Sequence, residues 1–186
     1  CGCIVFKDPT IGKYYKHDSP YTYFTSKDLH LGEISLECSR AGAAAAALWA
    51  TLQCFPLQHD KGLGMILQKT RRSALLWNDE IKKYSSLATF VQPQLDIVTY
   101  FPVPKNSSAA KVSLLSEKIF HNAMNHSEQP IYLAKFIVDS SIIKRNIPSF
   151  ELDQPQTTIL RSVLMKPEHF QFISQCIKEI AALAEE

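Results

Sequence analysis

The sequence has no hydrophobic run long enough to cross a membrane. Its longest fully apolar stretch, residues 41–50, consists mostly of alanine, and it is about half as long as the ~20 residues that a membrane-spanning helix needs. A buried helix is therefore the better interpretation of this stretch. The balance of 46% hydrophobic and 20% charged residues is that of a globular protein with a core of its own.

A strong charge of one sign is also missing. The chain has 20 Lys and Arg residues against 18 Asp and Glu residues, which gives a formal net charge of +2. The basic residues are scattered, apart from the pairs Arg71-Arg72 and Lys82-Lys83. A nucleic-acid-binding surface concentrates Lys and Arg on one face, so the sequence gives no reason to expect a nucleic-acid partner.

The signatures of several common cofactor and metal sites are absent. There is no GxGxxG, GxxxxGK, HExxH or GxSxG motif, and these mark dinucleotide, P-loop, zinc-protease and hydrolase sites. The six histidines show no metal-ligand spacing, and the five cysteines are an odd number without paired CxxC units. We therefore expect no metal site and no disulfide framework, and we expect buried, reduced thiols in a cytoplasmic protein.

The first third of the chain combines a strand pattern, an irregular segment and a helix pattern. The run Gly2–Lys7 predicts a strand buried on both faces. Residues 10–30 are polar and rich in tyrosine without a regular period, which is typical of a functional or mobile segment. Residues 40–54 predict a helix that is apolar on nearly all sides and therefore buried, with Ser39 as its N-cap. Because the chain enters a strand pattern at its first residues, we expect it to be the C-terminal part of a longer polypeptide.

The rest of the chain alternates helix and strand patterns. Apolar residues at three- and four-residue spacing predict an amphipathic helix from about Gly64 to Tyr84. The elements predicted after it are, in order, strands Leu87–Val91 and Ile97–Val103, a helix Lys111–His126, strands Ile131–Val138 and Thr157–Met165, and a final helix that starts at Pro167. This order indicates an α+β domain, residues 57–186, in which helices cover one side of an antiparallel sheet.

Two residues stand out for their chemistry. Strand alternation places Arg161 on the same face as Ile159 and Val163, where an unpaired guanidinium is costly. Either a protein carboxylate pairs with Arg161, or that face opens onto a cavity. Tyr23 lies within the irregular segment, and its neutral phenol can donate a proton, although a tyrosine in a loop more often packs or forms hydrogen bonds.

Four segments carry a resemblance to a known family. They are CGCIVFKDP at residues 1–9, YTYFTSKD at 21–28, LGEISLECSRAG at 31–42 and ILRSVLMKP at 159–167. In this order they resemble the C-terminal portion of the group II pyridoxal-5′-phosphate-dependent amino-acid decarboxylases, which include glutamate, aromatic-amino-acid and diaminobutyrate decarboxylases. The resemblance covers essentially the whole chain, and it is stronger in the first 50 residues than in the remainder.

The resemblance implies an α/β fold-type I enzyme that releases carbon dioxide from an L-amino acid. Residues 1–56 would be the C-terminal end of the large cofactor-binding domain, and residues 57–186 would be the small C-terminal α+β domain. The family forms homodimers whose active sites lie at the subunit interface. No membrane partner is implied.

The resemblance also suggests roles for single residues. Tyr23 matches the tyrosine of the mobile catalytic loop, which protonates Cα of the substrate after carbon dioxide leaves. Arg161 matches the arginine that binds the substrate carboxylate in several members, and Cys38 and Ser39 would lie near the cofactor phosphate of the partner subunit. The family's cofactor-binding lysine belongs to a His-Lys pair upstream of the first strand. Lys7 follows that strand and does not match the pair, so we expect this segment alone to be inactive.

Two other interpretations remain open at this stage. A different fold-type I lyase that also uses pyridoxal phosphate, such as an aldolase-type enzyme, would share the same architecture. A non-catalytic dimerisation or interaction module would share the exposed apolar surfaces without the chemistry. Substitution of Tyr23 separates the decarboxylase from the other lyase, and the association state of the chain tests the module.

Overall fold

The structure is a computed structural model of the 186-residue chain, and it describes residues 4–16, 34, 42–125 and 130–185. The chain divides into two compact units, Cys1–Pro56 and Leu57–Glu186. The division falls at the position where the sequence pattern changes. The assignment of residues 1–56 to a cofactor-binding domain stays a prediction.

In the first unit, the described residues form two helices. A short 3₁₀ helix, η1 (Pro9–Tyr15), begins where the side chain of Asp8 accepts a hydrogen bond from the Thr10 backbone N–H, at 2.8 Å. The second helix, α1 (Ala43–Cys54), has no buried residue, and its Trp49 side chain is 67% exposed. The predicted helix is thus present, but the prediction that it is buried is wrong, because no described element of this unit covers its apolar sides.

The predicted strand at Gly2–Lys7 is also not formed over its described part. Residues 4–7 have no strand assignment, and Ile4 and Val5 are 81% and 87% exposed. A strand needs a neighbouring strand to accept and donate its backbone hydrogen bonds, and no described strand pairs with this stretch. The prediction of a buried strand is therefore wrong for this structure.

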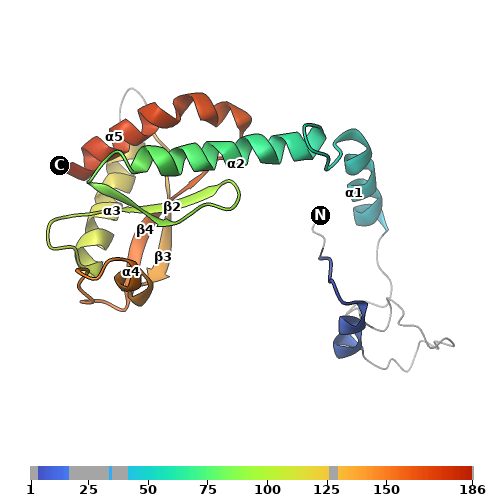
Figure 1. The fold of residues 1–186 in the computed structure, drawn as a ribbon, viewed down its shortest axis with the longest axis horizontal. Helices are drawn as coiled ribbons and strands as arrows, with labels where there is room; N and C mark the ends of the chain where they lie inside the picture. The colour runs from blue at the N-terminus through green and yellow to red at the C-terminus, as the bar shows by residue number, and fades with distance from the viewer. Residues whose placement is uncertain (1–3, 17–33, 35–41, 126–129, 186) are drawn as a thin grey trace. The chain divides into compact units, whose positions relative to one another are not determined.

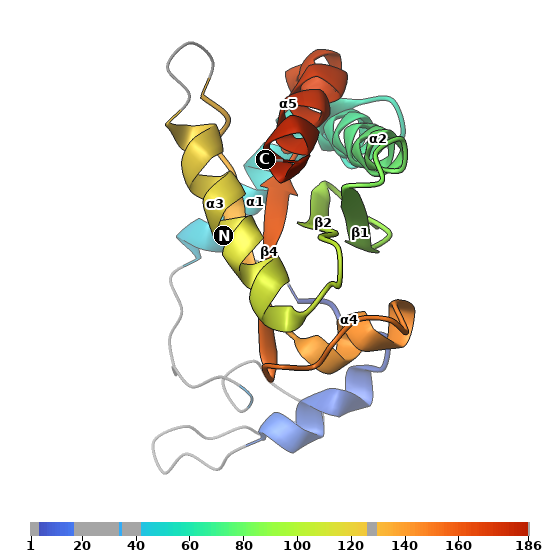
Figure 2. The same cartoon turned by 90° about the vertical axis from the view of Figure 1, so that its left-hand side faces the viewer.

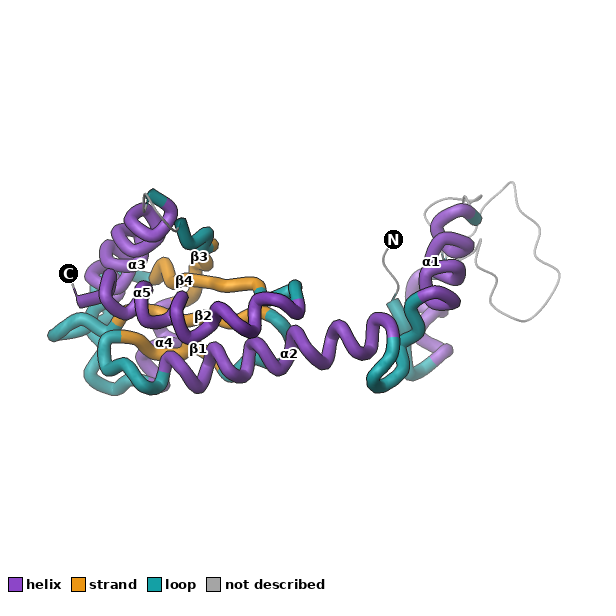
Figure 3. The backbone as a smooth tube through the Cα atoms, turned by 90° about the horizontal axis from the view of Figure 1, so that it is seen from above, coloured by secondary structure: helices purple, strands orange, loops and turns teal. Residues whose placement is uncertain are grey.

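The second unit is an antiparallel sheet with helices (Figure 1). Its elements, in chain order, are α2 (Gly62–Ile81), β1 (Leu87–Val91), β2 (Ile97–Pro102), α3 (Ala109–Met124), β3 (Ala134–Asp139), α4 (Ser140–Asn146), β4 (Gln156–Val163), the 3₁₀ helix η3 (Pro167–Phe172) and α5 (Ile173–Glu185). The strands lie in the order β1-β2-β4-β3, and every neighbouring pair is antiparallel. Figure 3 shows the four strands in this order.

The helices α2, α3 and α5 cover one face of this sheet. Figures 1 and 2 both show α2 and α5 side by side, and α5 also contacts α3. The main core lies between these helices and the sheet, and it includes Trp77 from α2, Tyr100 from β2, Ile119 from α3, Leu160 from β4 and Ile177 from α5. The prediction of an antiparallel sheet with helices on one side is confirmed.

A second, smaller core lies around the beginning of β4. It contains Ile159 of β4, Val112 of α3, Ile143 of α4 and Phe150 of the following loop. Ile159 and Leu160 are consecutive in the strand and belong to different cores, as expected because successive side chains in a strand point to opposite faces. The helix α4, which the sequence patterns did not predict, covers this second core.

The backbone of Gln58 comes very close to Gly64 at the start of α2. A Cβ atom added to Gly64 would lie 1.9 Å from the carbonyl oxygen of Gln58, which is too close for any other residue type. Gln58 forms an isolated antiparallel bridge with Lys61, and Lys61 is the N-cap of α2. Glycine at position 64 therefore allows the chain to turn tightly into the helix.

Candidate functional site

Arg161 lies in the middle of β4, between two neighbouring strands. It is directly opposite Thr99 of β2 on one side and Ala134 of β3 on the other. Strand alternation places its side chain on the face opposite Leu160, and Leu160 packs in the main core beneath the helices. Arg161 therefore lies on the opposite face of the sheet, which carries the second core around Ile159 at the beginning of β4.

The guanidinium of Arg161 has no protein partner in the described part of the chain. The residue is half-buried, and its Nε atom is buried without a hydrogen-bond partner. The Oγ1 atom of Thr99, on the opposing strand, is also buried and unpartnered. A buried polar group left unpaired costs about 1–3 kcal/mol, and more when the group is charged. A polar ligand bound here could therefore supply the hydrogen bonds that these two adjacent groups lack.

Large apolar side chains around Arg161 are also left uncovered. Val91 pairs with Thr99, Ile97 pairs with Val163, and Phe136 pairs with Ile159, so all three share the face of Arg161. Their exposed fractions are 52%, 46% and 41%. We call Val91, Ile97, Thr99, Phe136 and Arg161 the open face. It is an apolar surface that surrounds one cation.

The sequence left open whether a protein carboxylate pairs with Arg161. No ion pair joins Arg161 to a carboxylate of the described residues. The structure thus gives the structural ion pair no support within the described chain, and a ligand or another segment is left as the source of the anion. Sequence reasoning missed Thr99, although its position between the buried Val98 and Tyr100 of β2 was a signal that it faces away from the main core.

Three other predicted site residues lie outside the described residues. They are Tyr23, Cys38 and Ser39. Lys7 is described and exposed. The described residues do not contain a set of groups that fits pyridoxal phosphate.

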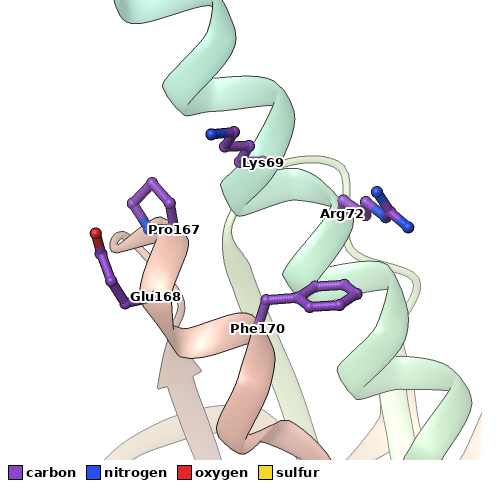
Figure 4. Close-up of a pocket in the computed structure, with 5 residues that line it drawn as sticks. All are labelled: Lys69, Arg72, Pro167, Glu168 and Phe170. Carbon is purple, nitrogen blue, oxygen red and sulfur yellow. The ribbon is translucent and has the colours of Figure 1, made fainter.

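A second group of basic side chains lines a groove between α2 and η3 (Figure 4). A groove of about 350 Å³ is lined there by Lys69, Arg72, Pro167, Glu168 and Phe170, and the guanidinium carbon of Arg72 lies 5.0 Å from the centre of the Phe170 ring. Both cations are exposed, and exposed ion pairs contribute only about 0–1 kcal/mol. Glu168 also offsets part of their charge. This groove is therefore a weaker anion site than the open face.

Two kinds of feature are absent from the described residues. Among residues 4–16, 34, 42–125 and 130–185, no three His, Cys, Asp or Glu side chains come close enough together to hold a metal ion. No helix within these ranges has the length and apolar character that crossing a bilayer requires. Of the described cysteines, Cys54 is exposed and Cys176 is half-buried, and neither forms a disulfide.

Comparison with known protein sequences gives one curated relative and no matching family model. The relative is an aspartate 1-decarboxylase from Aliivibrio fischeri (strain ATCC 700601 / ES114), which is 28% identical over 192 aligned positions that include 99% of this chain. The chain spans only 34% of the length of that relative. The likeness therefore covers about a third of that decarboxylase.

Comparison with solved structures shows the fold. Oryza sativa TDC with PLP and tryptamine matches 92% of this chain with a TM-score of 0.61 and 11% identity, and Catharanthus roseus tryptophan decarboxylase with L-tryptophan matches 92% with a TM-score of 0.61 and 14% identity. In each case 33% of the solved chain is covered.

A third solved structure extends the likeness to another enzyme. The glutamate decarboxylase domain of a diaminobutyrate-pyruvate transaminase and L-2,4-diaminobutyrate decarboxylase from Vibrio parahaemolyticus matches 76% of this chain and 26% of its own chain, with a TM-score of 0.51 and 17% identity. The described chain therefore has the mixed helix and antiparallel-sheet fold found in the C-terminal domains of these decarboxylases.

Proposed function

We propose that this chain is the C-terminal part of a pyridoxal-phosphate-dependent amino-acid decarboxylase. In this proposal, the enzyme removes the carboxyl group of an L-amino acid as carbon dioxide. The lysine that carries the cofactor is supplied by a part of the polypeptide outside this sequence. The chain itself supplies Arg161 to bind a substrate carboxylate and Tyr23 to return a proton to the substrate carbon.

The unpaired Arg161 is the observation that carries this proposal. A guanidinium presents its N–H donors in a planar fork that matches the two oxygens of a carboxylate. At Arg161 this fork lies opposite the unpartnered Thr99 hydroxyl on the neighbouring strand, and the Nε atom of the guanidinium is buried. Low local polarity strengthens an ion pair relative to one in water, so the open face favours a carboxylate-bearing ligand over a neutral one.

The role proposed for Tyr23 follows from the chemistry of decarboxylation. Loss of carbon dioxide leaves a carbanion on the substrate, and a group nearby must supply a proton to it. A phenol is neutral and protonated at physiological pH because its ordinary pKa is ~10, so Tyr23 can act as a general acid. Cys38 and Ser39 are proposed to lie near the cofactor phosphate of the partner subunit.

The cofactor and the assembly belong to the same proposal. Pyridoxal phosphate, held by residues outside the described ranges, would supply an electron sink for the electrons released when the carboxyl group leaves. We propose a cytoplasmic homodimer, since its free cysteines Cys54 and Cys176 fit a reducing compartment. The similar folds of solved amino-acid decarboxylases support this assignment.

Substitution of Tyr23 in the complete polypeptide tests the proposed chemistry. Tyr23→Phe keeps the ring and removes the acidic hydroxyl. We expect carbon dioxide release to continue while formation of the amine product falls and oxidative or transamination side products appear. An aldolase-type lyase with the same fold would be little affected. Equal amine yield from Tyr23→Phe and the wild type would contradict the role of Tyr23.

The exposed surface of α1 supports a second candidate function, a non-catalytic association module. This helix is rich in alanine, none of its residues is buried, and Trp49 is 67% exposed. Analytical ultracentrifugation of the chain, compared with Trp49→Glu, tests this candidate. A folded monomer at all concentrations would exclude the module, whereas a dimer that Trp49→Glu dissociates would support it.

A further inference from the structure

A small cavity lies on the helix-covered side of the sheet, in the second unit. It has a volume of about 140 Å³, and its polar lining residues include Trp77, Ser162, His169 and Cys176. Ser162 follows Arg161 in β4, so its side chain points to the opposite face from the guanidinium. The Ser162 side of the cavity therefore faces away from the guanidinium of Arg161, and a ligand there is not the carboxylate ligand of the proposed function.

Two ring nitrogens of residues that line this cavity are buried and unsatisfied. The indole Nε1 of Trp77 and the imidazole Nδ1 of His169 are both buried, and neither has a hydrogen-bond partner among the described residues. Trp77 is only 4% exposed. A buried tryptophan N–H normally finds an acceptor, and a buried donor without one carries a desolvation cost. The protein thus offers a donor at this cavity that no described residue uses.

The remaining polar groups of the cavity are already satisfied or uncharged. The hydroxyl of Ser162 shares a hydrogen bond of 3.0 Å with the hydroxyl of Tyr100. Burial raises the pKa of the Cys176 thiol, and the nearby Glu179 carboxylate raises it further, so this thiol stays protonated at neutral pH. The thiol of Cys176 and the hydroxyl of Ser162 carry no charge, which favours a neutral ligand.

The size and the apolar lining restrict the ligand further. A cavity of ~150 Å³ is large enough to hold a benzene ring, and this one is close to that size at about 140 Å³. Leu164 and Ile173, among its lining residues, are 4% and 1% exposed. Tyr132 and Phe172 also line it and are 78% and 52% exposed, so aromatic rings flank its open side.

We propose that this cavity is a binding site for a small neutral ring compound with one hydroxyl group, such as a phenol or a cyclic alcohol. The ring lies against the apolar lining. The hydroxyl oxygen accepts a hydrogen bond from Nε1–H of Trp77, and the hydroxyl proton is donated to Nδ1 of His169. Ordered water is a poorer occupant, because a buried water needs about two to four polar partners and most of the lining is apolar.

An NMR titration of the ¹⁵N-labelled chain with phenol tests the proposal. The sequence has 2 tryptophans, so the indole region contains one signal from Trp77 and one from Trp49, which lies in the other unit. We expect a saturable shift of the Trp77 signal and none of the Trp49 signal. Toluene has the same size without the hydroxyl, and we expect it to bind about threefold to tenfold more weakly because it leaves both nitrogens unpaired.

Two pairs of variants make the test specific. His169→Leu should lower phenol affinity about threefold to tenfold and leave toluene affinity unchanged, whereas His121→Leu, an exposed histidine of α3, should change neither. Cys176→Leu should fill the cavity and abolish binding of both compounds, whereas Cys54→Leu should not. If Cys176→Leu fails to fold, nuclear Overhauser effects between phenol and Trp77 in the wild-type chain replace it.

Three results would overturn the proposal. They are the absence of a saturable Trp77 shift with phenol, equal affinities for phenol and toluene, and equal effects of His169→Leu on both compounds. None of these measurements depends on decarboxylation. Arg161→Lys should leave phenol binding unchanged, so failure of this proposal and failure of the proposed function are distinguishable.

Discussion

Arg161 and Thr99 lie directly opposite each other on β4 and β2, and the Nε atom of one and the Oγ1 atom of the other are both buried without a hydrogen-bond partner in the described chain. A folded sheet rarely leaves two neighbouring polar groups unsatisfied. The pair lies on the sheet face opposite the main core, and we propose that a carboxylate ligand completes it.

The first prediction concerns the stability of the chain without a ligand. Arg161→Met keeps the length of the side chain and removes the unpaired charge, so it should raise the free energy of unfolding by about 1 kcal/mol. Arg145→Met, at an exposed position of α4, should change it by less than ~0.5 kcal/mol. Urea denaturation measures both. A loss of stability in Arg161→Met would show that the guanidinium has a partner within the chain.

The second prediction concerns the buried hydrogen bond between Tyr100 and Ser162. Burial raises the pKa of the Tyr100 phenol, although the Ser162 hydroxyl opposes this, so Tyr100 stays protonated and can donate. Tyr100→Phe or Ser162→Ala alone should each cost about 1–2 kcal/mol, because each leaves a buried hydroxyl unpaired. The double variant should cost less than the sum of the two. Additive losses in thermal or urea melts would exclude a direct hydrogen bond.

The third prediction concerns the start of α2. Gly64→Ala places a Cβ against the Gln58 backbone, and backbone cannot move aside as a side-chain end can. We expect it to destabilise the chain by about 1–3 kcal/mol. Gly42→Ala is the matched control, because a Cβ there has nothing within 4 Å. Equal melting temperatures for both variants would mean that the approach of Gln58 relaxes freely.

The fourth prediction concerns acid stability. The backbone N–H of Ala110 donates to the Asp153 carboxylate at 2.9 Å, and this bond, with the Ser108 side chain, holds the pKa of Asp153 below its ordinary value of 3.8. A lowered folded-state pKa means that the stabilising effect is present above the ordinary value and is lost as the pH falls through the folded value. The difference in stability between wild type and Asp153→Ala should therefore be largest near neutral pH and should shrink below about pH 4. A constant difference across this range would contradict the assignment.

The sequence patterns predicted most of the second unit because its elements are amphipathic. The stripe of Ala74, Trp77 and Ile81 indicated α2, and these residues are indeed buried. The short helix α4 was not predicted, because its N-cap is the last residue of β3, Asp139, whose side chain accepts from the Ser141 backbone N–H at 2.8 Å. A strand and a helix that share a boundary residue leave no turn signal between them.

The first unit was predicted less well for a different physical reason. Its apolar runs at Ile4–Phe6 and in α1 are patterns that need a covering partner, and within the described residues of this unit there is none. An apolar pattern shows which residues of a segment could be buried. It does not show whether another element is there to cover them. The same contrast holds for the candidate site. Strand alternation within β4 was enough to predict the face on which Arg161 lies, whereas the position of Thr99 and the cavity at Trp77 depend on contacts between distant segments.

Steady-state kinetics of Arg161→Lys in the complete polypeptide would test the central claim most directly. Lysine keeps the charge but loses the planar fork, so the value of KM for the amino-acid substrate should rise and kcat/KM should fall by about tenfold to a hundredfold, while the free energy of unfolding changes little. Unchanged values of KM and kcat/KM in a folded Arg161→Lys protein would contradict the claim that Arg161 binds the substrate carboxylate.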